Sequence, residues 1–181
     1  RNNESFLYAI NKYILGMRSL MKLEHDYVTA EEYYSDRKKY GIQAMFKDMY
    51  GNMIFTKSEE ERRICEWLSL HDIQFTYEEA YEYPTSSDLY RQYRPDFSIH
   101  YINEDGEKDR LYFEHFAIDK NGNVPLWFGT DYNNSEQDDI NIVNRWKIAN
   151  QVYKDGIDWK LKLHQAKETK LIYTTSAMFH D

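Results

Sequence analysis

Two carboxylates lie where β-strands are expected and where a charged side chain needs a partner. Asp96 follows Arg94-Pro95, and a proline at the entrance of a strand favours extended backbone. Glu114 lies between Phe113 and Phe116 in a strand apolar enough to be buried, where a carboxylate is costly unless it is paired or binds a cation. The spacing alone leaves two alternatives open. Each acid could pair with a nearby Arg or Lys, or both could share a hard cation such as Mg²⁺ or Mn²⁺, which takes oxygen ligands.

A third acid could come from the helix predicted after Ser58. Glu60 and Glu61 flank the apolar face of that helix, so either could point toward a sheet. Glu61 also stands three residues after Ser58, where a capping box places a glutamate. The helical pattern does not choose between the two acids, and a purely structural role for Glu61 stays open.

Candidate cations lie on a long helix predicted from about Asp139 to Ala166. We expect its sheet-facing side to be the apolar stripe Ile148, Val152, Trp159, Leu163 and Ala166. A second stripe runs beside it and holds Tyr153, Ile157, Lys160 and His164. Lys160 and His164 are four residues apart and can reach the same place, whereas Lys147 falls on the opposite face. The ordinary interpretation of Lys160 is a surface lysine whose ammonium is solvated, and that of His164 is a hydrogen-bonded side chain at the edge of the core.

The elements that must position these residues alternate between helix and strand. After the helix at Ser58, three strands are predicted at Ile73–Tyr83, Phe97–Tyr101 and Leu111–Ile118, with a hairpin turn at Asn103–Gly106. The long helix and a last strand at Lys170–Thr175 follow. This order predicts an α/β fold with a mixed sheet flanked by helices.

The chain divides into two expected parts. Residues 1–54 are predicted to be a helical accessory or connector segment, and residues 55–181 form the α/β domain. The first helix is expected from an apolar stripe at three- and four-residue spacing: Phe6, Leu7, Ile10, Ile14, Met17, Leu20 and Met21. A second helix is expected from Thr29, which opens a capping box.

Composition bounds the class of protein. The 181 residues are 41% hydrophobic and 17% aromatic, enough for a packed core. No stretch approaches the roughly 18 apolar residues of a membrane span. The one cysteine, Cys65, excludes an internal disulfide and fits the cytoplasm. The chain begins at Arg1, and we expect it to be part of a longer protein. Its net charge of −8 is unlike the basic charge usual for nucleic-acid binders. Two alternatives follow: other parts of that longer protein would hold any nucleic acid, or this chain does not act on nucleic acid.

Several motifs together resemble a known family. Over about residues 55–177 the chain is similar to a PD-(D/E)XK nuclease-like domain found within some bacterial UvrD-like superfamily 1 DNA helicases. The motifs are Lys57-Ser58-x-x-Glu61, Ile73-x-Phe75-x-Tyr77-Glu78, Tyr93-Arg94-Pro95-Asp96-Phe97, Phe113-Glu114-His115-Phe116, Trp127-Phe128, Gly156-x-x-Trp159-Lys160-x-x-Leu163-His164 and Thr169-Lys170-Leu171-Ile172-x-Thr174-Thr175-Ser176.

The resemblance implies a restriction-endonuclease-like fold and a metal-dependent deoxyribonuclease. Glu61, Asp96 and Glu114 match the acids of that superfamily, with Asp96 and Glu114 as the ligands of Mg²⁺ or Mn²⁺. The family signature places a lysine two residues after the strand glutamate, where this chain has Phe116. Some members carry that lysine on the following helix, and Lys160 is the matching candidate. The metal would polarise the scissile phosphate, and Lys160 would neutralise charge that develops on it.

Other roles and functions stay open at this level. His164 or His115 could assist proton transfer. The seven glycines form no Walker A loop, so an ATP-driven motor would lie in the rest of a parent helicase. One alternative is a catalytically degenerate module that binds DNA or protein within such a helicase, and another is an acidic α/β interaction domain unrelated to DNA. DNA versus RNA, endonuclease versus exonuclease and the oligomeric state are not determined.

Overall fold

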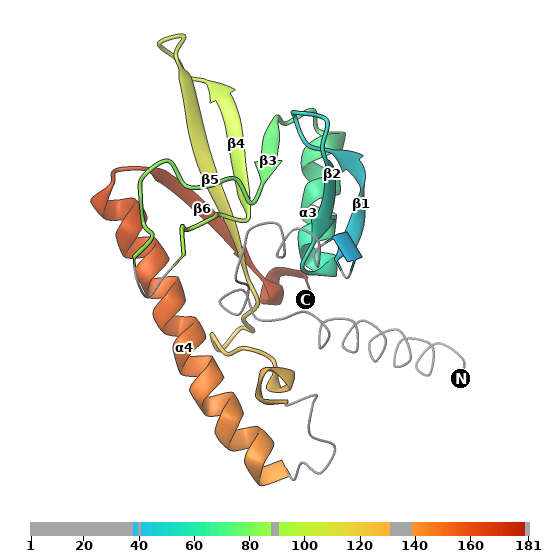
Figure 1. Ribbon diagram of the computed structural model, residues 1–181, viewed down its shortest axis with the longest axis vertical. Coiled ribbons are helices and arrows are strands. Elements are labelled where there is room, and N and C mark those ends of the chain that lie inside the picture. The colour runs from blue at the N-terminus through green and yellow to red at the C-terminus, as the bar shows by residue number, and fades with distance from the viewer. Residues whose placement is uncertain (1–37, 40, 88–90, 131–138, 180–181) are drawn as a thin grey trace.

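The computed structural model describes residues 38–39, 41–87, 91–130 and 139–179. The helices expected at residues 6–21 and from Thr29 lie outside these ranges. The described elements, in chain order, are β1 Ile42–Lys47, β2 Met53–Thr56, α3 Glu59–Leu70, β3 Phe75–Tyr77, β4 Phe97–Ile102, β5 Lys108–Phe116, the 3₁₀ turn η2 Leu126–Gly129, α4 Asp139–Ala166, β6 Lys170–Thr175 and the 3₁₀ turn η3 Ser176–Phe179 (Figure 1).

The main sheet has four strands in the order β3-β4-β5-β6. The pairs β3–β4 and β4–β5 are antiparallel, whereas β5 and β6 are parallel. A parallel pair needs a long crossover, and here α4 supplies it. Figure 1 shows the sheet between α3 with the β1–β2 hairpin on one side and α4 on the other. The predicted order of helix, three strands, helix and strand in a mixed α/β fold is confirmed.

The first strand of the sheet is much shorter than predicted. The pattern indicated a strand over Ile73–Tyr83, but β3 ends at Tyr77. Glu78 has a φ of 52°, a left-handed conformation that a continuous strand does not accommodate. The backbone N–H of Glu78 still donates to the carbonyl of Asp96 at 3.0 Å, so the turn keeps it beside the entrance of β4.

Part of the expected helical segment 1–54 is a β-hairpin. β1 and β2 pair as antiparallel strands, and the proposed boundary at residue 55 cuts through β2. Their connection is a tight turn in which the Asp48 carboxylate accepts from the backbone N–H groups of Tyr50 and Asn52, at 2.9 and 2.8 Å. Gly51 lies between these two residues with a φ of 81°, which glycine adopts without strain. The hydrogen bonds of Asp48 and the conformation of Gly51 favour a tight turn between two strands over a helix. The hairpin packs in the same core as α3, so it belongs to the α/β unit.

One core fills the face of the sheet that α3 covers. It combines Ala44 and Ile54 of the hairpin with Ile64, Cys65 and Leu68 of α3 and with Phe75, Phe97 and Phe113 of the three antiparallel strands. Ser58 begins α3 as predicted, because its hydroxyl accepts from the backbone N–H of Glu61 at 3.0 Å. Capping and burial together hold α3 against the sheet.

The inward side of α4 is only partly the one predicted. Leu163 of the apolar stripe packs against the buried tyrosine cluster Tyr81, Tyr93 and Tyr112. Ile148 and Val152 of that stripe are 67% and 65% exposed, however, and the neighbouring stripe with Tyr153, Lys160 and His164 faces inward. The sheet surface below α4 carries Glu114 and this tyrosine cluster, so polar and aromatic side chains make the better match there.

Within the described residues, no helix combines the length and apolarity needed to cross a membrane.

Replacing Gly129 or Gly156 by alanine is expected to change the stability of the fold in opposite directions, because the two glycines differ in their contacts with α4. A Cβ on Gly129 would lie 2.2 Å from the carbonyl oxygen of Ile142 and 2.7 Å from the amide nitrogen of Trp146, both backbone atoms of α4. Gly129→Ala is therefore expected to destabilise the fold by about 1–3 kcal/mol. Gly156 lies within α4 with no atom within 4 Å of an added Cβ, and Gly156→Ala should stabilise by ~0.5–1 kcal/mol. Urea unfolding of both variants measures this, and shifts of the same sign would contradict the packing.

Candidate active site

Strand pairing brings Asp96 and Glu114 together. In the antiparallel β4–β5 pair Phe97 lies opposite Phe113, so the next residues outward, Asp96 and Glu114, face each other. Opposed residues of paired strands point to the same face of a sheet. Pro95 is fully buried directly before Asp96, at the entrance of β4. The two acids therefore share the face that α4 covers.

Glu114 is fully buried and both of its oxygens accept hydrogen bonds. The Tyr93 hydroxyl donates to Oε1, and the Lys160 ammonium donates to Oε2 at 2.6 Å. Burial raises the pKa of Glu114 and the charge of Asp96 raises it further, while Lys160 and Tyr93 act in the opposite direction. The resulting pKa is about 7. Glu114 can therefore exchange a proton or a cation near neutral pH.

Lys160 reaches Glu114 from α4, as expected if the lysine is carried by the helix that follows the strand. Its ammonium contacts Glu114 and stands 5.6 Å from the ring centroids of Tyr93 and of Phe116. Phe116 occupies the position where the family signature has a lysine, so the cation of α4 lies over that strand position. Burial lowers the pKa of Lys160, but the charges of Glu114 and Asp96 outweigh burial and the pKa is raised. Lys160 therefore stays an ammonium.

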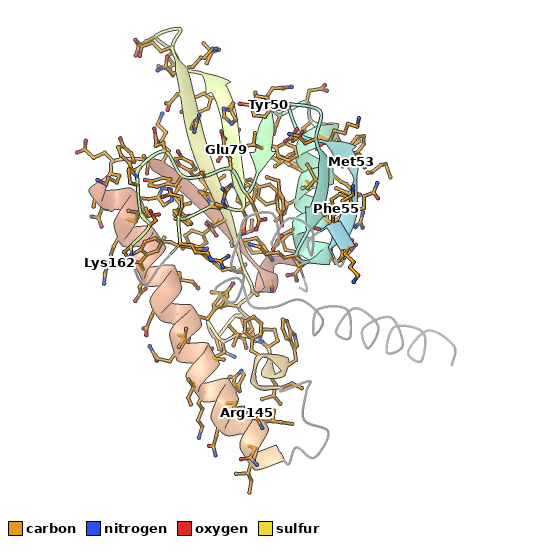
Figure 2. All side chains as sticks on the ribbon, in the orientation of Figure 1. Tyr50, Met53, Phe55, Glu79, Arg145 and Lys162 are labelled. Carbon is orange, nitrogen blue, oxygen red and sulfur yellow. The ribbon has the colours of Figure 1, made fainter. Side chains whose placement is uncertain are left out.

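The other lysines of α4 do not approach the acids in this way. Lys147 is exposed, as the helical pattern predicted. Lys162 lies on the outer side of α4, away from the sheet (Figure 2). Lys154 donates to the side-chain oxygen of Asn123 at 2.9 Å, so among the contacts of the four α4 lysines in the described part of the chain, only that of Lys160 is with Glu114.

His164 lies behind Tyr93 in a buried chain of hydrogen bonds. Its Nε2 is 3.2 Å from the Tyr93 hydroxyl, and its Nδ1 is 2.8 Å from the Thr169 hydroxyl, which in turn is 2.6 Å from the hydroxyl of Tyr81. Because Tyr93 donates to Glu114, Nε2 must be the donor to Tyr93 and Nδ1 accepts from Thr169. Burial and the charge of Lys160 lower the pKa of His164 to about 4, so the ring is neutral. His164 thus orients Tyr93, and through it Glu114.

Asp96 is held by a backbone donor and faces a lysine that the sequence did not single out. Its Oδ2 accepts from the backbone N–H of His115 at 2.8 Å, and its Oδ1 is 3.7 Å from the ammonium of Lys57. Lys57 also forms an ion pair with Glu78, whose side chain is 3% exposed. Lys57 and Glu78 both occur in the motifs on which the resemblance was based, and this was the only sequence signal that could have pointed to them. Neither residue was assigned a chemical role from the sequence.

Glu61 lies in the first turn of α3, where its backbone N–H donates to Ser58, and its side chain is linked to the acids through Lys57. Its carboxylate accepts from the backbone N–H of Lys57 at 3.0 Å and from the Tyr77 hydroxyl. Lys57 is the residue whose ammonium faces Asp96. Glu61 therefore fixes the backbone that carries this second lysine, which is the structural alternative left open above, and its catalytic role stays a prediction.

Glu60 and His115 form a separate cluster on the α3 side of the sheet. His115 contacts Glu60 through Nε2 at 2.8 Å and Thr174 through Nδ1 at 2.9 Å, and Ser176 donates to the same Glu60 oxygen at 2.7 Å. Successive strand residues alternate between faces, so the His115 ring lies across the sheet from Glu114. The expectation that His115 could serve the acids in proton transfer is wrong for this reason.

The donor set at the paired acids suits a hard divalent cation. In the described part of the chain, no group of three or more His, Cys, Asp or Glu side chains is arranged to hold a metal. Mg²⁺ commonly uses one or two carboxylates, with water and substrate phosphate completing its shell. Asp96 and Glu114 provide such a pair, because Asp96 Oδ2 and both oxygens of Glu114 each keep a further lone pair beyond the hydrogen bond they accept, and Asp96 Oδ1 faces Lys57 at 3.7 Å.

Comparison of the chain with protein-family models, curated proteins and solved structures found no match in any of the three. Its function is therefore inferred from the site itself.

Proposed function

We propose that this chain is a metal-dependent nuclease domain of restriction-endonuclease-like fold that cleaves DNA, and that it is part of a longer UvrD-like DNA helicase. The observation that carries the proposal is the contact of Lys160 with Glu114, across the strand position of Phe116 and beside Asp96. Two acids and one lysine at a sheet end are the set that the resemblance leads us to expect. The order of the strands and of the α4 crossover also fits that fold.

Each residue has a defined task in this proposal. Asp96 and Glu114 would hold Mg²⁺ or Mn²⁺, which when bound polarises the scissile phosphate and lowers the pKa of the attacking water. Lys160 places a positive charge where negative charge grows on the phosphate, so it stabilises the transition state more than the ground state. Tyr93, oriented by His164, holds the Glu114 carboxylate in place. Lys57 balances the charge of Asp96 and Glu78.

A second candidate function is a non-catalytic DNA- or protein-binding module on the same fold. It is favoured by the internal charge compensation of the site, in which Lys160 pairs with Glu114 and Lys57 with Glu78 and Asp96. A module of this kind would keep the lysines as permanent partners of the acids. It would therefore bind neither Mg²⁺ nor Mn²⁺ at millimolar concentration.

Calorimetric titration with Mn²⁺ in the absence of DNA separates the two functions. The nuclease should show saturable millimolar or tighter binding at pH 8 and cleave DNA when the metal is present. Because the pKa of Glu114 is raised to about 7, its carboxyl group is mostly protonated at pH 6 and ionised at pH 8. A proton then competes with the cation, and binding should weaken about tenfold at pH 6.

The control for this titration is Glu114→Gln, which cannot ionise. Its residual Mn²⁺ affinity should lack the change between pH 6 and pH 8. If the wild-type chain bound no metal at pH 8, the nuclease proposal would be wrong and the non-catalytic module would replace it.

A further inference from the structure

Two exposed aromatic side chains flank the Lys160–Glu114 pair. Trp159 is 45% exposed, and its ring meets that of Tyr93 edge-on at 5.5 Å between centroids. Tyr173 is 48% exposed and lies 5.3 Å from the ring of Phe116. The Lys160 ammonium stands 5.6 Å from both inner rings, so an unbroken series of contacts, called the aromatic row below, links Trp159, Tyr93, Lys160, Phe116 and Tyr173.

The two outer rings are held by the same elements that build the site. Trp159 directly precedes Lys160 on α4, and Tyr173 is the β6 partner of Glu114 in the parallel β5–β6 register. Paired residues of neighbouring strands share a face, so Tyr173 lies on the face of the acids. The Lys160 side chain is itself 28% exposed.

The charge of the chain disfavours a double-stranded ligand. Duplex binding depends on neutralising many phosphates with Lys and Arg, whereas this chain has a net charge of −8. The two lysines at the site already face acids, since Lys57 pairs with Glu78 and Lys160 with Glu114. Single strands depend less on phosphate neutralisation than a duplex does, and the stacking of unpaired bases on aromatic rings adds affinity that tolerates any sequence.

From the aromatic row we infer that the substrate is single-stranded DNA, whose bases stack on Trp159 and Tyr173 while the phosphate between them is presented to Lys160. This inference builds on the proposed nuclease function, because it supplies the substrate that the site would cut. It places the site at an unpaired end or a displaced strand. The stacking rings, and not a basic groove, then provide most of the affinity.

Fluorescence anisotropy with a labelled thymidine 20-mer in EDTA tests the inference without cleavage. Trp159→Ala and Tyr173→Ala should each weaken binding about tenfold, the order expected when a base loses its stacking partner. Trp159→Phe should recover most of the loss, because it keeps a ring. Binding of a matched duplex should be weaker in the wild type and unchanged in these variants. The logarithm of affinity should fall with the logarithm of salt at a slope of only about −0.7 to −1.4, equivalent to one or two phosphates.

Trp67→Ala is the matched control. Trp67 is 54% exposed, but it lies on α3 and stacks on His71, across the sheet from the acids. Its loss should leave binding unchanged.

Three results would overturn the inference. They are equal weakening of duplex and single-strand binding by Trp159→Ala and Tyr173→Ala, no weakening by either variant, and tighter binding of a uridine 20-mer than of the thymidine 20-mer. Cleavage in Mg²⁺ is measured separately. If the chain cleaves DNA but Trp159→Ala and Tyr173→Ala bind single strands as well as the wild type, only the stacking inference is wrong. If the chain binds single strands selectively through these rings but does not cleave DNA, only the nuclease function is wrong.

Discussion

Glu114→Gln and Asp96→Asn are expected to abolish metal-dependent DNA cleavage while the chain remains folded. Each change removes one of the two negative charges that would hold the cation, and a single lost electrostatic contact at such a site already lowers turnover by more than about a hundredfold. Both replacements keep an oxygen acceptor. In Glu114→Gln the amide oxygen can still accept from Tyr93, and in Asp96→Asn it can still accept from the backbone N–H of His115, so these two donors stay paired.

Stability measurements separate a lost charge from a lost fold. In Asp96→Asn the charge that helps to raise the pKa of Glu114 is gone, so the thermal midpoint should stay the same or rise slightly. Asp109→Asn is the matched control on the same strand. Asp109 pairs with Lys170 and Tyr101, five residues from Glu114 along β5, and its replacement should leave cleavage unchanged. Wild-type cleavage rates in either site variant would show that Asp96 and Glu114 are not the metal ligands.

Lys160→Ala is expected to lower the turnover number about a hundredfold with little change in DNA binding. The reason is that the ammonium acts mainly on charge that develops in the transition state, while the stacking rings and the remaining contacts hold the ground state. Single-turnover cleavage at saturating DNA measures the first quantity, and binding in EDTA measures the second. Lys160→Ala also leaves Glu114 without its strongest partner, so the pKa of Glu114 should rise further and the pH optimum should move upward.

Lys147→Ala is the control for this prediction. Lys147 lies on the same helix but on its exposed side, and its replacement should change neither turnover nor binding. Similar losses in both variants would mean that the lysines of α4 act only through the overall charge of the helix. A Lys160→Ala variant that binds DNA poorly but turns over normally would assign the lysine to substrate affinity.

Local sequence signals determined much of the framework. The Ser58 cap and the acids after it set the start of α3, the Asn103–Gly106 turn joined β4 to β5, and α4 runs from Asp139 to Ala166 as predicted. These features depend on neighbours within a few residues, so they can be read without the fold. The pairing of Asp96 with Glu114 follows from the same information, because a hairpin register fixes which residues face each other.

The orientation of α4 was decided only by the tertiary structure. Periodicity shows which residues share a stripe of a helix, but the stripe that turns inward depends on the surface opposite it. That surface holds Glu114 with Tyr93 and Tyr112. Lys160 and His164 face it and contact Glu114 and Tyr93, whereas Ile148 is exposed. The approach of Lys57 to Asp96 and the placement of His115 across the sheet have the same cause, since each joins segments far apart in the chain. Contacts of this kind are created by packing, and no local pattern in the sequence encodes them.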